Sequence, residues 1–411
     1  MENPTARTVD PPSPPDEPRH VKRGGLAVLG VAFAFWITMA GTTVPTPLYP
    51  LYGEEFGFTP FTVTVVFAVY ALGVVVGLLV FGRLSDQVGR RPVLIAATLL
   101  SVGAAAVFLL AQSVAAMLVA RVVSGFSAAL VTGAATAALA ERLGPDSRAK
   151  PATVALFANM GGLAGGTLLA GILADVAPSP LRTPWVVVLA LAALGTLGVM
   201  VTGESSAHRS GFTLRVQPLH VPGEIRSDFL RSAMAAGSGF AVLGVLTAVT
   251  GLFLGTVRHE TSHALTGFVV FTAFACTAFG QLLVRVLKPA AALPASCVGL
   301  IVAAGLIATS MATGGLIPLL VGAALDGLAT ALAVGHGVGT ITTRSAPLHR
   351  GASVSTFFAV LYSMLAVPAI GVGVLIRETG LRPAGEIFSA LVAALCLGVL
   401  LSLVRTRGKA A

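Results

Sequence analysis

Long apolar runs separated by short charged turns constrain this chain more than any other feature. Residues 69–81 and 93–111 contain no charged side chain, whereas the turn between them, Gly82–Pro92, carries three arginines and one aspartate. Apolar runs of this kind cross the hydrocarbon layer of a membrane as helices, and a charged turn lies at the water interface. Because the pattern repeats along the chain, it predicts a protein built of membrane-spanning helices.

Twelve such segments can be drawn in the sequence. Each has about 20 residues or more and is long enough to cross roughly 30 Å of hydrocarbon. They are residues 25–46, 61–82, 92–111, 116–140, 151–174, 184–203, 231–256, 264–286, 291–311, 315–341, 351–376 and 384–404. We therefore expect an all-α polytopic membrane protein in the lipid bilayer.

The composition argues against a soluble enzyme or a nucleic-acid-binding protein. Of the 411 residues, 55% are hydrophobic and 10% are charged, and the mean hydropathy is +0.90, whereas about a quarter of a soluble domain is charged. The net charge of +9 follows from basic loops, so we expect no nucleic-acid partner. The three cysteines lack metal-ligand spacing and no catalytic or phosphate-binding motif occurs, so we expect no enzyme, metal site or cofactor.

The basic residues of the loops alternate between the two sides of the membrane. Loops on one side and both termini are basic, whereas the loops on the other side hold only Arg182, Arg258, Arg377 and Arg382. The positive-inside rule places the basic side in the cytoplasm. We therefore expect an even number of spans in the plasma (inner) membrane, with both termini cytoplasmic.

The longest loop between spans, residues 204–230, divides the predicted spans into two sets of six. The expected domains are a disordered cytoplasmic tail (1–24), an N-terminal bundle (25–203), a cytoplasmic loop (204–230), a C-terminal bundle (231–405) and a short tail (406–411). A Pro-rich, polar tail cannot bury enough apolar surface to fold.

The two halves look like copies of one unit. Arg142-x-x-Pro145-x-x-Arg148 recurs as Arg344-x-x-Pro347-x-x-Arg350, and at the same offset Gly125 and Gly133 correspond to Gly327 and Gly335. A duplicated six-helix unit, with a substrate site between the copies near the membrane midplane, is typical of transporters.

The charged turn resembles the signature G-x-L-x-D-x-x-G-R-R, which lies between the second and third spans of the major facilitator superfamily. The matching residues are Gly82, Leu84, Asp86, Gly89, Arg90 and Arg91, whereas Gln87 departs from the usual basic residue. Anchoring by positive charge alone explains the arginines but not Asp86 or the two glycines. The resemblance implies two six-helix bundles that alternate access, similar to drug:proton antiporters and sugar-efflux transporters.

In that family the signature forms a cytoplasmic gate. By resemblance, Asp86 accepts hydrogen bonds from the start of the eleventh span near Gly351–Ser353, where free N–H groups and the helix dipole favour an acid. The expected gate residues are Gly82, Asp86, Gly89, Arg90, Arg91 and Arg350.

Two charges lie well inside predicted spans, where each costs roughly 2.5–3.5 kcal/mol at the centre on insertion scales. Asp326 is the only acid near a span midpoint, and we hypothesise that it binds the coupling proton; an ion pair or hydrogen-bond anchor is the alternative. Arg121 opens Arg121-x-x-x-Gly125, which resembles the family's fourth-span motif for proton coupling; simple anchoring near the interface is the alternative. In the alignment of the two halves Arg121 corresponds to Ala323, one helical turn from Asp326, so the two charges could approach each other across the central cavity.

The fifth span resembles the family's antiporter motif, G-x-x-x-G-P-x-x-G-G, through Gly162, Gly166 and Gly171. Thr167 replaces the expected proline and Ala170 replaces a glycine. The resemblance favours export, although small residues at this spacing also simply let helices pack closely.

Polar residues within spans are candidates for the substrate cavity, with interhelical hydrogen bonding as the alternative. The first span ends in a Thr- and Pro-rich stretch whose prolines bend or end the helix. The candidates are Thr42, Thr46, Tyr70, Asn159, Gln281, His336, Tyr362 and Ser363.

Together these features predict a proton-coupled antiporter that exports small neutral or amphipathic organic molecules and functions as a monomer. The alternatives are a proton symporter for solute uptake and a non-transporting membrane receptor or scaffold.

Overall fold

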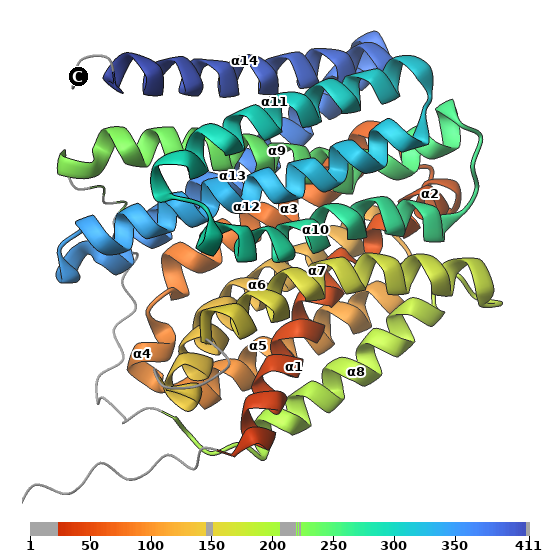
Figure 1. The fold of residues 1–411 in the computed structure, drawn as a ribbon. Helices are drawn as coiled ribbons and strands as arrows, with labels where there is room; N and C mark the ends of the chain where they lie inside the picture. The colour runs from red at the N-terminus through yellow and green to blue at the C-terminus, as the bar shows by residue number, and fades with distance from the viewer. Residues whose placement is uncertain (1–23, 145–150, 206–218, 220, 222, 408–411) are drawn as a thin grey trace, which may run out of the picture.

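The computed structural model is a bundle of helices with no strand in the part of the chain it describes (Figure 1). It describes all residues except 1–23, 145–150, 206–218, 220, 222 and 408–411. The predicted tails, apart from Gly24, Thr406 and Arg407, and most of the predicted inter-bundle loop lie outside the described residues. Among the described residues, twelve helical segments are long and apolar enough to cross a membrane. The chain is therefore a multi-pass membrane protein of the predicted fold class.

In the first half, helices α1 to α3 and α5 to α8 form the spans. α4 is only a short helix between α3 and α5. Their bounds are α1 Gly25–Thr43, α2 Pro45–Phe56, α3 Pro60–Phe81, α4 Leu84–Val88, α5 Arg90–Leu109, α6 Val114–Leu143, α7 Pro151–Val176 and α8 Thr183–Met200.

In the second half, a short 3-10 turn precedes six long helices. Their bounds are η1 Gly223–Ile225, α9 Arg226–Val257, α10 His263–Val286, α11 Pro289–Thr313, α12 Leu316–Arg344, α13 Pro347–Thr379 and α14 Leu381–Arg407. α9 begins within the segment predicted as a loop, and α13 begins four residues before the predicted eleventh span.

The first span is longer than predicted. The helix breaks at Val44 and resumes as α2, which continues ten residues beyond the predicted end at residue 46. Pro45 occupies the first position of α2, where a missing N–H removes no helical hydrogen bond. The prolines therefore mark a break within the span and not its end, and α2 brings Tyr49 and Tyr52 into the protein interior.

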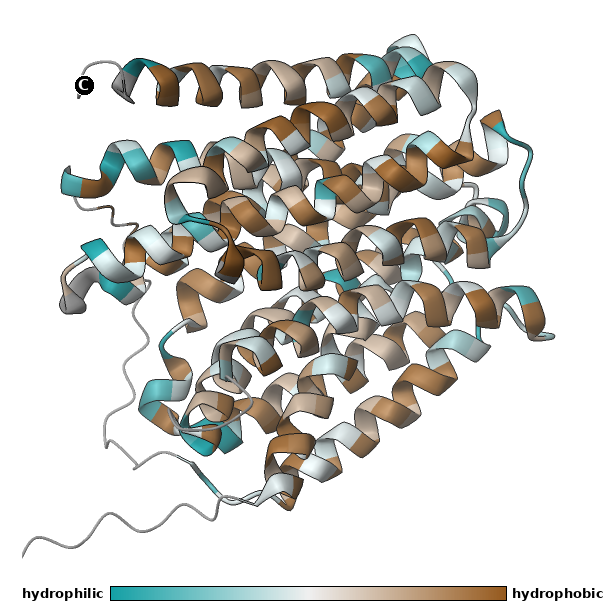
Figure 2. Ribbon diagram, in the orientation of Figure 1, coloured by the Kyte–Doolittle hydropathy of each residue, from teal (hydrophilic) through white to brown (hydrophobic). Residues whose placement is uncertain are grey.

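Apolar residues cover the outside of the bundle as well as its core. Leu72, Leu194 and Leu391 are 45%, 56% and 62% exposed, and Figure 2 shows apolar residues along the middle of the helices and polar residues at their ends. A protein in water would bury such leucines, whereas lipid accepts them.

Each half packs as a unit, and the two halves meet mainly along two helix pairs, with smaller contacts of α2 and α3 with α9 and of α2 with α10. α7 packs against α10, and α3 packs against α13. The start of α1, the end of α14 and α4 lie at one side of the molecule, which we call the terminal side; the α7–α8 and α9–α10 turns lie at the opposite side, the far side (Figure 1).

The glycines of the repeat pack in equivalent ways at one of the two predicted positions. A Cβ on Gly125 would lie 2.5 Å from the Tyr70 carbonyl of α3, and one on Gly327 would lie 2.2 Å from the Ala273 carbonyl of α10. α6 therefore approaches α3 as α12 approaches α10. The second pair differs, because a Cβ on Gly133 would meet nothing within 4 Å, whereas one on Gly335 would lie 2.7 Å from the Val284 side chain.

Candidate functional site

Arg121 is buried in the middle of the first bundle. Only 1% of its surface is exposed. One guanidinium nitrogen, Nη1, donates to the Thr42 carbonyl oxygen at 2.5 Å, and the other, Nη2, donates to the Tyr49 hydroxyl. The guanidinium also lies 5.7, 5.6 and 5.8 Å from the ring centroids of Tyr49, Tyr70 and Phe108. Neutral oxygens and aromatic rings therefore hold this charge.

The break between α1 and α2 builds this environment. Thr42 lies beside the break, and Tyr49 lies on α2. Tyr70 on α3 completes the group, with its ring facing the Arg121 guanidinium. Tyr49 was not among the predicted site residues, because the first span was expected to end at residue 46; the available signal was a tyrosine among prolines that begin a second helix.

Asp326 lies in the interior of the second bundle, on α12. It is 0% exposed, and neither carboxyl oxygen has a hydrogen-bond partner. α12 packs against α9, α10 and α11 of the same bundle. Asp326 thus lies among helices of its own bundle, and the approach to Arg121 that the repeat suggested is not present in this structure.

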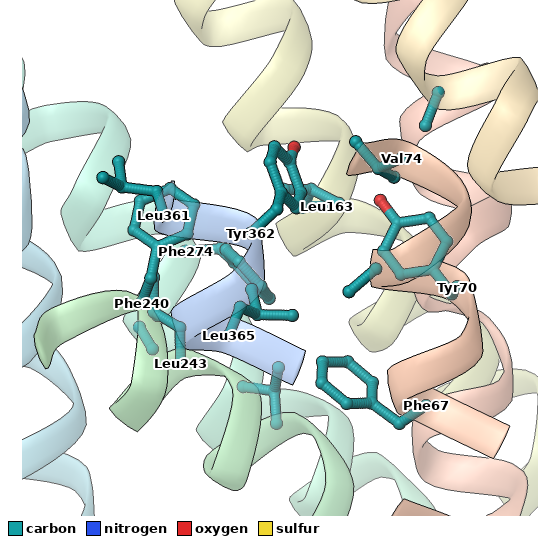
Figure 3. Packing of buried hydrophobic residues seen from close by; sticks show 14 of the residues in the cluster. Phe67, Tyr70, Val74, Leu163, Phe240, Leu243, Phe274, Leu361, Tyr362 and Leu365 are labelled. Atoms are coloured by element: carbon teal, nitrogen blue, oxygen red, sulfur yellow. The ribbon is translucent and has the colours of Figure 1, made fainter. Parts of the chain in front are cut away.

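Aromatic side chains from both bundles meet between α3, α9 and α13. Tyr70 of α3 and Tyr362 of α13 lie on facing sides of this layer, with Phe67 and Phe240 nearby (Figure 3). The Phe240 ring packs edge-on against the Tyr362 ring at 5.9 Å between centroids. We call Phe67, Tyr70, Phe240, Phe274 and Tyr362 the aromatic layer. Of the predicted cavity residues, Tyr70 and Tyr362 are brought together here.

The remaining predicted cavity residues divide into two kinds. Thr46 and Asn159 each keep a buried side-chain oxygen without a hydrogen-bond partner. In contrast, Gln281 donates to the Ala331 carbonyl at 3.2 Å, Ser363 to the Ala359 carbonyl at 2.8 Å, and His336 Nδ1 lies 3.0 Å from the Ser232 hydroxyl. These last three side chains make the hydrogen bonds within or between helices that were the alternative interpretation.

The charged turn forms a local network at the terminal side. Arg90 contacts Asp86, the Ser85 hydroxyl at 2.8 Å and Glu141 at 3.0 Å. Glu204 accepts from the backbone N–H groups of Arg90 and Arg91 at 2.9 and 3.0 Å, which caps the start of α5. Glu141 and Glu204 were missed, although acids in such basic loops are a usable signal.

Glycine is required at one position of the turn. Gly89 has a φ of +108°, and a Cβ there would lie 2.8 Å from the Glu204 carboxylate. Gly82 is exposed and ends α3. Gly89 thus lets Glu204 reach the start of α5.

The predicted gate partners lie apart in this structure. Asp86 pairs with Arg90, and its side chain is 60% exposed. Arg350 donates to the Ser345 carbonyl at 3.4 Å. The prediction that Gly351–Ser353 form the helix start is wrong, because α13 begins at Pro347 and these residues lie beyond its first turn.

The glycines of the antiporter-like stretch face two different partners. Cβ atoms on Gly162 and Gly166 would lie 2.3 and 2.1 Å from the carbonyls of Trp36 and Ala40 on α1, within one bundle. A Cβ on Gly171 would lie 2.4 Å from the His263 carbonyl, across the bundle interface. Thr167, which replaces the expected proline, donates to the Gly267 carbonyl of α10 at 3.1 Å.

A hydrogen-bonded cluster joins the bundles at the far side. The Asp175 carboxylate of α7 accepts from the backbone N–H groups of His263 and Ala264 at 2.8 and 2.9 Å and from the Ser262 hydroxyl at 2.8 Å. His263 Nδ1 lies 2.8 Å from the same carboxylate. We call these four residues the far-side clamp. An acid at a helix N-terminus satisfies free N–H groups and interacts with the helix dipole.

Comparisons with known proteins agree with this geometry. The family model described as Major Facilitator Superfamily matches residues 31–371. The inner membrane transport protein YnfM of Escherichia coli (strain K12) is 33% identical over 85 residues, which cover 20% of this chain and 20% of YnfM.

Solved transporter structures share the fold at low sequence identity. The nucleoside transporter NupG (D323A mutant) has a TM-score of 0.71 at 12% identity, covering 92% of this chain and 99% of its own. A bacterial homologue of the human lysosomal transporter Spinster, inward-facing and unoccupied, has a TM-score of 0.70 at 15% identity, covering 93% and 98%. The human organic anion transporter MFSD10 has a TM-score of 0.66 at 18% identity, covering 91% and 99%.

Proposed function

Because the chain belongs to the Major Facilitator Superfamily, a family of membrane transporters, we propose that it is a proton-coupled secondary transporter of small neutral or amphipathic organic molecules. It works by alternating access, in which the two bundles open their shared interface first to one side of the membrane and then to the other. The substrate lies at the aromatic layer, and Asp326 carries the proton.

The main support for proton coupling is that Asp326 is buried without a hydrogen-bond partner or an ion-pair partner among the described residues. The residue is fully buried, and both carboxyl oxygens lack a hydrogen-bond partner. Removing a bare carboxylate from water is costly unless the group carries a proton or is paired. A carboxyl group that is protonated while it is shielded from water and ionised once water reaches it would link proton release to the opening that admits water.

The aromatic layer supports a substrate site that is mainly apolar. It draws side chains from both bundles, and Tyr70 and Tyr362 supply hydroxyl groups (Figure 3). Transporter sites of this kind lie where repeats meet near the midplane. The neighbours named as nucleoside and organic anion transporters also carry small organic molecules.

We propose export, because the fifth span resembles the antiporter motif at Gly162, Gly166 and Gly171. Proton symport is the second candidate, since the first two of these glycines pack within one bundle and such packing serves transport in either direction. A receptor or scaffold would move no solute.

Proteoliposomes containing a pH-sensitive dye in the lumen test the proposal. Addition of a transported compound from a panel of drugs, sugars and nucleosides is expected to produce a proton flux, and the direction of substrate movement under a pH gradient separates antiport from symport. Asp326→Asn is expected to abolish the proton flux while substrate exchange continues. Full proton-driven transport by this variant would overturn the assignment of Asp326.

A further inference from the structure

The positive charge of Arg121 has no acidic partner in the structure. Its hydrogen bonds go to a carbonyl and a hydroxyl, and Nε is buried without a partner. None of the ion pairs among the described residues includes Arg121. A buried charge without a counter-charge is costly, and an anion that enters the site is attracted to it.

No described acid is placed to neutralise this charge. Asp326 lies inside the other bundle, where its carboxyl has no partner. Glu54 and Asp175 lie near the far-side helix ends, whereas Glu141 lies at the terminal side and is engaged with Arg90. A counter-charge for Arg121 would therefore have to come from a solute.

Arg121 lies next to one member of the aromatic layer, Tyr70. The centre of its guanidinium is 5.6 Å from the ring centroid of Tyr70, and Tyr70 faces Tyr362 across the bundle interface (Figure 3). In surroundings of low dielectric constant a unit charge acts strongly over such distances. An anionic group placed beside Tyr70 would feel this charge while its apolar part contacts Phe67, Phe240 and Phe274.

We propose that the substrates are amphipathic organic monoanions. The anionic group is bound by Arg121 together with the hydroxyls of Tyr49 and Tyr70, and the hydrocarbon part is bound by the aromatic layer. This inference rests on the proposed function and narrows its substrate class to one sign of charge.

Binding of three probes of matched shape tests the charge preference. The probes are 2-naphthoate, 2-naphthylmethanol and 2-naphthylmethylammonium, and isothermal titration calorimetry on purified protein in detergent, corrected with protein-free micelles, gives the affinities. We expect 2-naphthoate to bind at least about tenfold more tightly than the alcohol, as for a charge-assisted hydrogen bond, and the ammonium compound to bind most weakly.

Variants then assign the preference to Arg121. In Arg121→Gln the affinity for 2-naphthoate is expected to fall to that of the alcohol, whose own affinity does not change. Arg121→Lys keeps the charge and is expected to keep the preference. Arg182→Gln, which removes an exposed arginine at the far side, is the control and is expected to bind as the native protein does.

Several outcomes would overturn the inference. The inference is wrong if the native protein binds naphthoate and the alcohol with equal affinity, or if it does not bind naphthoate. Both results are independent of whether the variants fold. The inference is also wrong if Arg121→Gln still binds naphthoate more tightly than the alcohol. The binding assay needs no proton gradient, so it is independent of the proton-flux experiment. If no proton flux is found but naphthoate is still preferred, only the proton coupling is refuted. If the neutral alcohol drives as much proton flux as naphthoate, only this inference is refuted.

Discussion

Arg121 and Asp326 are opposite buried charges, but their surroundings differ. Arg121 is held by two oxygens and three rings, whereas Asp326 has no hydrogen-bond partner. The sequence could locate both, because a charge within an apolar span is conspicuous. The sequence could not show that each side chain faces the interior of its own bundle. In spans with so few polar residues, the hydropathy pattern does not reveal which neighbouring helix each helix face contacts.

Asp326→Asn should leave the fold intact. The substitution keeps the shape of the side chain, and no ion pair or hydrogen bond of the carboxyl is lost, so the melting temperature of the purified protein should change by less than about 2 °C, as for a mutation with a free-energy effect below about 1 kcal/mol. Differential scanning fluorimetry measures this value. A large drop would instead mean that the carboxyl has a structural role.

The glycines of α6 offer a matched pair of substitutions. Gly125→Ala places a methyl group 2.5 Å from the Tyr70 carbonyl, whereas at Gly133 nothing lies within 4 Å. The first should destabilise by about 1–3 kcal/mol through overpacking, and the second should be neutral or stabilise by up to about 1 kcal/mol, because alanine favours helix. Thermal unfolding of the two variants in the same detergent gives the comparison, and equal melting temperatures would contradict the close contact of α6 with α3.

At the scale of elements, most span positions followed from hydropathy alone. The error in the first span has a physical cause: residues 45–56 contain three prolines and two glutamates, which resemble a loop, but the prolines at positions 45 and 47 fall in the first turn of α2, where they are tolerated. The bonds between elements were less predictable. The far-side clamp joins residues 87 to 89 positions apart, a relation that local sequence patterns do not contain.

The far-side clamp is expected to hold the two bundles together at that side. Asp175→Asn removes the charge that the start of α10 binds, and a hydrogen bond to a charged group contributes about 1.5–3 kcal/mol. Partial exposure reduces this value, so we expect the population with the far side open to rise by roughly tenfold. Spin labels on cysteines at Val176 and Thr261, with the three native cysteines replaced by serine, report the change as a longer inter-label distance.

Glu260→Gln is the matched control for the clamp. Glu260 precedes α10 at the same side but pairs with Arg258 within the second bundle. Its loss should leave the label distances unchanged. If Asp175→Asn behaves like this control, the contacts of Thr167 and the glycines must hold the bundles together without the carboxylate.

For the whole molecule, the distribution of basic residues predicts the orientation in the membrane. Arg83, Arg90 and Arg91, with Arg142 and Arg344, lie at the terminal side, and the far-side turns hold four arginines, Arg182, Arg258, Arg377 and Arg382. The twelve spans return the chain to the side on which it began. The terminal side should therefore face the cytoplasm, because basic loops are retained there during insertion.

Reporter fusions in Escherichia coli test this orientation. A fluorescent protein joined to the C-terminus should fold and fluoresce, and alkaline phosphatase at the same place should be inactive; a fusion truncated after Pro180, in the α7–α8 turn, should reverse both signals. Two more truncations, in the α9–α10 and α13–α14 turns, extend the comparison to the second bundle. A fluorescent protein at the N-terminus completes the set: if it and the C-terminal fusion reported opposite sides of the membrane, the number of spans would be odd and the two-bundle arrangement would be contradicted. The opposite result for every fusion, with an active phosphatase at the C-terminus, would keep the fold but place the far-side clamp on the cytoplasmic face.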